Sequence, residues 1–288
     1  MYTCINDIVK CFQFLTPILY ADDTNLFYES KNLTQDISKI NEDLSRLSEW
    51  CQQNKLTINL AKTQYIVIKN AQNHFLLPPN LIFLNRVSLT EAENIKFLGT
   101  LIDKRLSFKA HAEYLEANIR PYVGLMYRCA QFLPKEILLL IYNSYVNSKI
   151  NYCIEAYGTA CKSTLTGIHI LQKRISRIIT KSTFHAPSDP IFRKLNVLNV
   201  HKLFIFRTLI ASHKKFHSLS PSSTTHLKHS HFTRTSITNL PLPQSTTSCG
   251  HRSPDFQVAD LWNKLDMKLR SITNLTEFRR RLRQHLLQ

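Results

Sequence analysis

Glycine is scarce in this sequence, with only 5 among 288 residues. Tight turns and strained loops need glycine most often, so its scarcity favours a helix-rich fold. The 7 cysteines are odd in number and have no paired spacing, which argues against a disulfide framework. The sequence also lacks an apolar run of about 18 residues and a secretory signal, so we expect a soluble, intracellular chain with no membrane partner.

Zinc-binding patterns are missing as well. Cys153, Cys161 and His169 are spaced too widely for a zinc knuckle, and Cys249 with His251 is a lone pair. We therefore expect no zinc site.

Positive charge is concentrated in one part of the chain. Residues 1–100 carry 9 Lys or Arg and 10 Asp or Glu, a net charge of −1, whereas residues 101–288 carry 28 and 10, a net charge of +18. Lys and Arg displace condensed counterions from phosphate backbones, so this asymmetry predicts a nucleic-acid partner. A membrane surface is the competing polyanion, but the basic residues are spread over many segments rather than gathered on one amphipathic helix.

The stretch ILYADDTNLFY, residues 18–28, places two aspartates between two apolar runs. Both runs are typical of strands and the polar Asp-Asp-Thr-Asn between them is typical of a turn, so the stretch predicts a hairpin. Asp22 and Asp23 allow two interpretations. They cap the turn by binding backbone N–H groups, or they hold a divalent cation that relieves the repulsion between adjacent carboxylates. Mg²⁺ prefers oxygen ligands, and its presence would make the hairpin a site of nucleotidyl transfer.

Three blocks of this sequence resemble one family. The tetrad Tyr-Ala-Asp-Asp, residues 20–23, resembles the Tyr-X-Asp-Asp box of reverse transcriptases, and with the next threonine it resembles the box of non-LTR retrotransposon polymerases of the jockey-like type. The blocks Trp50–Ile68 and Asn94–Leu115 are similar to the two that follow in these polymerases. In the last block Phe108 replaces the usual tryptophan, and His111 stands at the place of the usual histidine.

The resemblance implies an RNA-directed DNA polymerase that uses Mg²⁺, an RNA template and a DNA primer, in the nucleus and cytoplasm. It implies that Asp22 and Asp23 are catalytic and bind metal, and that the catalytic Lys62 lies near the incoming triphosphate. From the residues alone, Lys62 is more typical of a solvated lysine before an edge strand. The block from Asn94 implies a hairpin that grips the primer and is followed by the thumb.

Apolar spacing of three and four residues predicts a helix over 33–54, with Thr34 as its N-cap and Asp36 in its first turn. Alternation around Tyr65 and Val67 predicts a strand within 57–70. Further helices are predicted over 108–132, 133–158, 165–182 and 200–216, and a basic amphipathic helix capped by Thr276 ends the chain. In the apolar helix over 133–158, the aromatic stripe is more typical of core than of base stacking; its members are Tyr142, Tyr145 and Tyr152.

The helix over 165–182 has an apolar stripe and a basic side. Lys173, Arg174, Arg177 and Lys181 share the basic side. A charge run is often just a solvated face, but a run of one sign also fits a phosphate backbone. We expect these four residues to bind nucleic acid.

The expected fold is α+β. A small antiparallel sheet from Ile18 to Ile102 with one helix against it, the remnant of a polymerase palm, precedes a mostly helical bundle. We expect the end of the palm over 1–107, the thumb and following basic helices over 108–218, a flexible linker over 219–254, and a C-terminal helical segment over 255–288.

The family takes one essential aspartate from a strand upstream of the Asp-Asp hairpin, and Asp7 does not match it. The upstream polymerase segment with its fingers is missing from this chain. We therefore expect the C-terminal part of a reverse transcriptase that is inactive alone. The alternative is a non-catalytic, basic RNA- or DNA-binding helical module in which the palm is vestigial.

Overall fold

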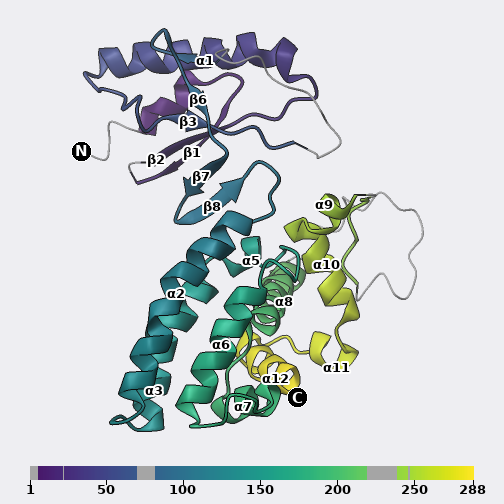
Figure 1. The fold of residues 1–288 in the computed structure, drawn as a ribbon. Helices are drawn as coiled ribbons and strands as arrows, with labels where there is room; N and C mark the ends of the chain where they lie inside the picture. Colours follow the sequence, from purple (N-terminus) through teal and green to yellow (C-terminus); the bar gives the residue numbers. More distant parts are fainter. Residues whose placement is uncertain (1–5, 22, 70–81, 219–238, 246) are drawn as a thin grey trace. The chain divides into compact units, whose positions relative to one another are not determined.

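The structure is a computed structural model that describes residues 6–21, 23–69, 82–218, 239–245 and 247–288 (Figure 1). The chain divides into two compact units. The first comprises Met1–Ile95 with Asp103–Arg105, and the second comprises Lys96–Ile102 with Leu106–Gln288.

The first unit combines one long helix with short strands. The 3-10 helix η1 (Asn6–Cys11) precedes a hairpin of β1 (Thr16–Tyr20) and β2 (Asp23–Phe27), and the helix α1 (Leu33–Gln53) follows. The later strands of this unit are β3 (Gln64–Tyr65), β4 (Phe83–Leu84), β5 (Val87–Ser88) and β6 (Thr90–Glu91). The strands β7 (Asn94–Phe97) and β8 (Thr100–Asp103) lie at the division between the units, and their residues from Lys96 to Ile102 belong to the second unit.

The described strands pair in twos and do not form one sheet. β1–β2 and β4–β5 are antiparallel, β3–β6 is parallel, and β7 pairs with β8. The α+β class is confirmed, but the single antiparallel sheet expected from Ile18 to Ile102 is wrong for the described residues. The strand expected within 57–70 is limited to Gln64–Tyr65 among those residues. Alternation predicts extended backbone, but a longer ladder also needs a partner strand that the local pattern does not identify.

Helix α1 packs one apolar face against the strands. Its buried apolar residues recur every three or four positions, as the sequence predicts: Ile37, Ile40, Leu44, Leu47 and Cys51. The N-cap is Asn32 and not Thr34, which lies in the first turn. Asp36 is in that turn as predicted, and its Oδ2 accepts a hydrogen bond of 2.6 Å from the Ser30 hydroxyl. The helix therefore starts two residues before the position that the threonine indicates.

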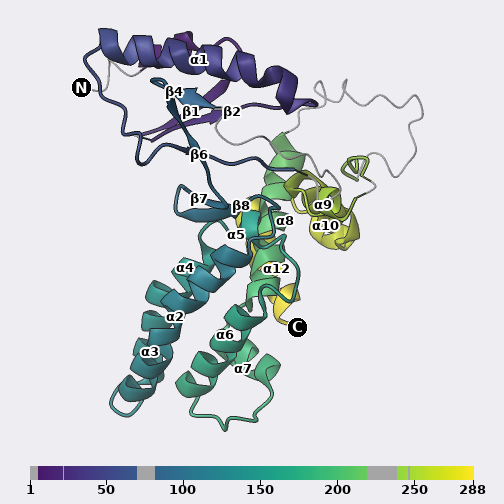
Figure 2. The ribbon, with the colours of Figure 1, turned by 45° about the horizontal axis from the view of Figure 1, so that its top comes forward.

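The second unit is a helical bundle joined to the β7–β8 hairpin. Helices α2 and α6 pack along each other, and they lie side by side in both ribbon views (Figures 1 and 2). The helical segments are α2 (Lys109–Cys129), α3 (Lys135–Ile141), the π-helix η2 (Tyr142–Asn147), α4 (Ser148–Asn151), α5 (Ile154–Tyr157), α6 (Thr166–Ile179), α7 (Ser188–Leu195), α8 (Val200–Ser218), α9 (Ser248–His251), α10 (Pro254–Lys264), α11 (Met267–Arg270) and α12 (Leu275–Leu287).

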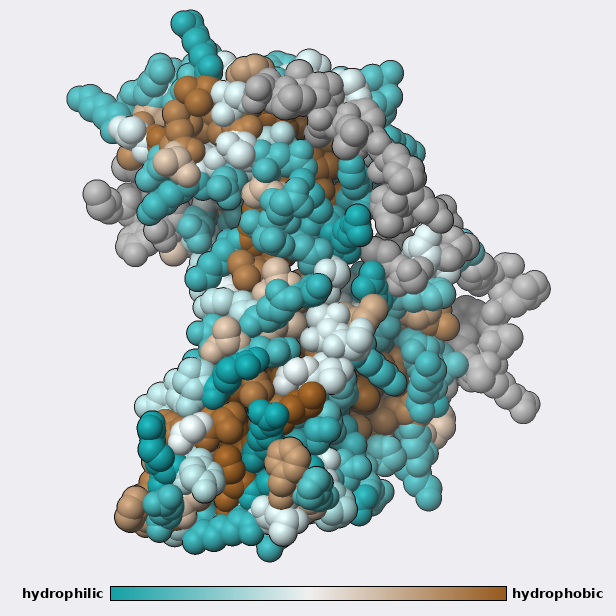
Figure 3. Space-filling model, in the orientation of Figure 1, coloured by the Kyte–Doolittle hydropathy of each residue, from teal (hydrophilic) through white to brown (hydrophobic). Residues whose placement is uncertain are grey.

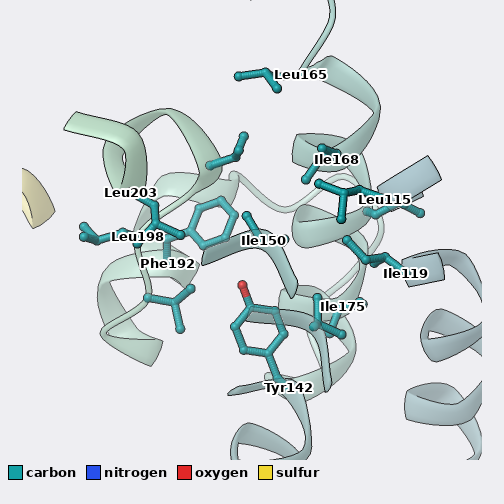
Figure 4. Packing of buried hydrophobic residues seen from close by; sticks show 14 of the residues in the cluster. Leu115, Ile119, Tyr142, Ile150, Leu165, Ile168, Ile175, Phe192, Leu198 and Leu203 are labelled. Carbon is teal, nitrogen blue, oxygen red and sulfur yellow. The ribbon is translucent and has the colours of Figure 1, made fainter. Parts of the chain in front are cut away.

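The largest apolar cluster of this unit surrounds Tyr142, whose hydroxyl points into the cluster (Figure 4). The buried amide of Gln172 in α6 crosses the cluster: its Nε2 donates to the Tyr142 hydroxyl at 2.9 Å, and its Oε1 accepts from the backbone N–H of Val200 at 2.7 Å. Burial of a polar amide is tolerated when both of its ends are hydrogen-bonded. Gln172 thus ties α6 to the start of α8.

The apolar stretch expected as one helix over 133–158 is interrupted. A π-helical segment follows α3, the last short helix begins only at Ile154, and Tyr152 between them is extended with ψ 122. Five of its fully buried residues are spaced by four, and Tyr157 follows the last of them after three: Leu138, Tyr142, Val146, Ile150 and Ile154. A spacing of four drifts around an α-helix of 3.6 residues per turn, and the wider π-turn offsets part of that drift. Tyr145 and Tyr152 are 52% and 53% exposed, so the prediction that all three tyrosines belong to the core is wrong for these two.

The end of the chain packs on α8. Of the tract predicted as a linker, residues 219–238 lie outside the described residues. Its described part contains α9 and the buried Leu240, whose backbone N–H donates to Asn263 Oδ1 at 2.8 Å. Helix α12 is capped by Asn274, which accepts from the backbone N–H of Thr276 at 2.9 Å, so Thr276 is not the cap. Across the described residues, none of the helices combines the length and apolarity that crossing a membrane requires.

Candidate functional site

The Tyr-Ala-Asp-Asp tetrad lies at the tip of the predicted hairpin. Tyr20 pairs with Asp23 across the two strands, so the connection consists of Ala21 and Asp22, two residues and not the four that the polar run indicates. Ala21 has a positive φ of 53°, and two-residue connections of this kind suit the right-handed twist of a hairpin. Asp22 lies outside the described residues, and Asp23 is exposed at the start of β2.

One face of the hairpin is apolar and open. Strand residues alternate between faces and cross-strand partners share one, which places Asp23 on the same face as Tyr20 and Ile18. Ile18, Tyr20 and Phe27 on that face are 47%, 62% and 47% exposed. The opposite face carries Leu19 and Leu26 toward the core of the first unit. The Asp23 carboxylate is therefore accessible and has apolar neighbours.

A buried carboxylate in α1 holds the start of this hairpin. Asp43 is fully buried, and its Oδ2 accepts the backbone N–H groups of Phe14 and Leu15, each at 2.8 Å, while Gln13 N–H lies 3.1 Å from both oxygens. Burial alone raises the pKa of Asp43, but these three N–H donors and the charge of Arg46 outweigh it, so the pKa lies below its ordinary value. Asp43 thus fixes the segment that leads directly into β1.

Sequence reasoning missed Asp43, although a signal was present. The residue interrupts the apolar stripe of α1 next to Leu44. A carboxylate in a buried stripe needs hydrogen-bond partners, so the pattern indicates a partnered aspartate even though it does not show which backbone groups serve.

The described residues do not form a metal site by themselves. They contain no group of three His, Cys, Asp or Glu side chains placed to hold a metal ion. Asp23 is the one carboxylate of the predicted pair that the structure describes, and a single carboxylate seldom holds Mg²⁺ without other ligands. Asp7 lies in η1 and pairs with Lys10 at 2.8 Å, both exposed.

Lys62 is exposed in the turn that precedes β3. Its backbone N–H donates to the carbonyl oxygen of Asn59 at 3.1 Å, which holds the turn. Within the described part of the chain, its side chain forms no ion pair with Asp23. The structure therefore leaves this positive charge open to solvent.

The β7–β8 hairpin turns at Leu98 and Gly99, which both have positive φ, 44° and 83°. Two residues of the helical unit hold it: the Tyr152 hydroxyl donates to the Leu98 carbonyl oxygen at 2.6 Å, and His111 Nδ1 accepts the backbone N–H of Leu101 at 3.3 Å. His111 is buried, and burial lowers its pKa, which keeps it the neutral acceptor that this bond needs. His111, which stands at the place of the usual histidine in the resemblance, therefore holds the β7–β8 hairpin in this structure.

The structure brings three of the four predicted basic residues together. Arg174 and Arg177 of α6 and Lys181, which follows the helix with a φ of 53°, line one cavity of about 700 Å³. Lys173 is not among the lining residues, and its charge contributes, after burial, to lowering the pKa of His169 to about 4.

The cavity has both polar and apolar lining residues. Its lining residues are Val123, Tyr127, Ala130, Gln131, Arg174, Arg177, Ile178, Lys181, Ser182 and Phe184. None of them is a carboxylate. Figure 3 shows apolar side chains between hydrophilic ones over the region of α2 and α6. The site can accept a ligand that has both negative charge and an apolar part.

Comparisons with known proteins identify relatives of the region that contains the hairpin. The family model described as reverse transcriptase (RNA-dependent DNA polymerase) matches residues 1–102. The chain is 24% identical to "Probable RNA-directed DNA polymerase from transposon X-element" of Drosophila melanogaster over 63% of its own length and 20% of that protein. It is 28% identical to "RNA-directed DNA polymerase from mobile element jockey" of the same species over 62% of its length and 19% of that protein. It is 29% identical to "Probable RNA-directed DNA polymerase from transposon BS" of Drosophila melanogaster over 64% of its own length and 20% of that protein.

Residues 1–102 therefore carry a reverse transcriptase domain match. More particularly, the chain is homologous to RNA-directed DNA polymerases of non-LTR retrotransposons, which confirms the resemblance found in the sequence. The chain spans about a fifth of the length of these curated relatives. No solved structure matches it.

Proposed function

We propose that this chain is a segment of an RNA-directed DNA polymerase that copies an RNA template from a DNA primer. One observation carries the proposal: the region that matches the reverse transcriptase family contains Tyr20 and Asp23 paired at the tip of a hairpin. An exposed carboxylate at such a tip can reach a substrate, because neither a neighbouring side chain nor a helix covers it within the described residues.

In this proposal Asp22 and Asp23 hold Mg²⁺ together with carboxylates from other parts of the polymerase. When bound, Mg²⁺ neutralises charge on the transferred phosphoryl group and activates the attacking hydroxyl. Asp43 positions the hairpin by holding the segment before β1. Lys62 offers an exposed positive charge for the incoming triphosphate. The helical unit, with most of the net charge of +18 in residues 101–288, contacts the nucleic-acid backbone.

The test is to join this chain to the upstream polymerase segment of a relative and to measure primer extension on an RNA template. Asp22→Ala and Asp23→Ala should each abolish extension, and Lys62→Gln should slow it. The control is Asp7→Ala, an exposed aspartate outside the hairpin, which should retain the activity. An active fusion that tolerates Asp22→Ala would exclude the proposed metal role.

A second function rests on the distribution of charge. The basic helical unit could bind RNA or DNA without catalysis, since the described residues of the hairpin supply one carboxylate and no metal cluster. In that case the fusion would bind nucleic acid with the usual dependence on salt and would not extend a primer under any metal condition.

A further inference from the structure

We propose that the cavity between α2 and α6 binds one unstacked nucleotide of a single-stranded nucleic acid, with its base on an aromatic ring and its phosphate on the basic side chains that line the cavity. This inference rests on the proposed nucleic-acid function and adds the class of ligand and the place where it binds.

Within the part of the chain that the structure describes, no carboxylate neutralises the cations of the cavity. Among the described residues, Arg174, Arg177 and Lys181 form no ion pair with a carboxylate. By contrast, Arg280 and Arg281 of α12 both pair with Glu277, at 2.6 and 2.8 Å. Positive charge gathered in a concave site without acidic partners attracts a polyanion more strongly than the same charge spread over a convex surface.

Arg177 is the fixed member of this group. Its Nε and Nη2 donate to the carbonyl oxygen of Ala186 at 3.0 and 2.9 Å, and its guanidinium carbon lies 5.9 Å from the centre of the Phe184 ring. The carbonyl holds the side chain but does not cancel its charge. Arg174 lies one turn earlier on the same helix and is exposed, which leaves it free to move toward a phosphate.

Two aromatic rings lie open at the same cavity. Phe184 and Tyr127 both line the cavity and are 67% and 66% exposed, so their rings are accessible to a ligand. Every base has a π-face, so an aromatic ring beside cations is the combination that single-stranded nucleic-acid sites use. A double helix keeps its bases stacked and cannot present one to this cavity.

The size of the cavity agrees with this ligand. Pockets for small organic groups measure roughly 300–1,000 Å³, and this one measures about 700 Å³. Gln131 and Ser182 add polar groups that can hydrogen-bond a base or a sugar. An anionic lipid surface would match the charge but would not need a concave polar site.

The test measures fluorescence anisotropy of the full chain with three probes of equal length: single-stranded oligothymidylate, the same strand with one internal abasic position, and a duplex. We expect the single strand to bind about tenfold more tightly than the abasic strand, in line with the loss of one stacked base. Phe184→Leu should remove this difference. The matched control is Phe132→Leu, a ring that is 83% exposed and does not line the cavity.

The phosphate contacts are tested with Arg174→Gln against Arg193→Gln, an exposed arginine of α7. Arg174→Gln should weaken binding of all three probes more than Arg193→Gln does. The cavity does not bind a base if the wild type binds the intact and the abasic single strands equally, or if Phe184→Leu still distinguishes them. Either result would leave the proposed nucleic-acid binding intact. If no probe binds, both fail. Tighter binding of a phosphotyrosine peptide than of oligothymidylate would also overturn the inference.

Discussion

The Asp43 carboxylate in the middle of α1 accepts the backbone N–H of Leu15 at 2.8 Å, 28 positions earlier in the chain. Leu15 directly precedes β1, the strand that leads to the Tyr-Ala-Asp-Asp turn. A fully buried side chain of α1 therefore fixes where the hairpin begins.

Replacing Asp43 should destabilise the first unit. Asp43→Ala removes the acceptor for the buried N–H of Leu15 and for two part-buried N–H groups, and a buried donor left unsatisfied costs about 1–3 kcal/mol, so we expect a loss of about that size. Asp43→Asn keeps one acceptor oxygen and should lose less. The measurement is the free energy of unfolding in urea. Glu49→Ala, an exposed position of α1, is the control and should change it by less than about 0.5 kcal/mol. Equal stability of Asp43→Ala and the control would contradict the anchoring role.

The helical unit should lose stability as the pH falls below about 6.5, the ordinary pKa of histidine. Burial and, less strongly, the charges of Lys173 and His201 lower the pKa of His169 to about 4, and burial also lowers that of His201. The unfolded chain binds these protons more readily than the folded chain, so the free energy of unfolding decreases as the pH falls from 6.5 toward 4.

The measurement for this dependence is the midpoint of denaturant unfolding of the helical unit between pH 7.5 and about 4.5. His169→Gln should make the midpoint less dependent on pH, because one of the groups that binds protons on unfolding is gone. His285→Gln, at an exposed position of α12, should leave the dependence as in the wild type. An unfolding midpoint that rises as the pH falls would contradict the predicted loss of stability on acidification.

The two arginines of the cavity should separate stability from binding. Arg177→Gln removes two charge-assisted bonds to Ala186 O, so it should lower the free energy of unfolding by about 1–3 kcal/mol as well as weaken nucleic-acid binding. Arg174→Gln should weaken binding with little change in stability. The checks are urea unfolding and anisotropy with single-stranded oligothymidylate at two salt concentrations. Loss of stability in Arg174→Gln but not in Arg177→Gln would contradict the view that Arg177 stabilises the fold and Arg174 serves binding alone.

How much of the fold and of the candidate site could be predicted from the sequence depended on how far apart in the chain the interacting residues lie. The repeats of Ile40, Leu44 and Leu47 in α1 and of Ile168 and Ile175 in α6 are local, and they predicted both helices. The hairpin around Asp23 was also predicted from a local pattern, two apolar runs with polar turn residues between them. The Asp43–Leu15 and Gln172–Val200 bonds join distant segments, and no local pattern identifies such a partner. The apolar pattern did not predict that Tyr152 would be exposed either, because a π-helical segment and a break in the helix precede it.

The turn of the β7–β8 hairpin should not tolerate a side chain at Gly99. Its φ of 83° favours glycine, and an added Cβ would lie 3.3 Å from Cε1 of Tyr152. We expect Gly99→Ala to lower the free energy of unfolding of the helical unit by about 1 kcal/mol or more. Tyr152→Phe, which removes the hydroxyl that bonds to Leu98 O, should cost about 0.5–1.5 kcal/mol. Gly124→Ala is the control, since nothing lies within 4 Å of a Cβ there and the position is helical. Gly99→Ala at wild-type stability would contradict the described turn.

The last prediction concerns catalysis by the chain alone. Two metal ions about 4 Å apart need carboxylates that converge from separate elements. The described residues supply Asp23 and no cluster of three ligands, and Asp22, its neighbour in the sequence, would add one more carboxylate. Positioning of primer and triphosphate supplies much of the rate in phosphoryl transfer, and the exposed Asp23 does not position either substrate by itself. We therefore expect no primer extension on an RNA template by the isolated chain with Mg²⁺ or Mn²⁺, whereas the fusion with an upstream polymerase segment extends it. Extension by the isolated chain that Asp22→Ala abolishes would show that another acidic residue completes the site, and Asp7→Ala would then be the first variant to measure.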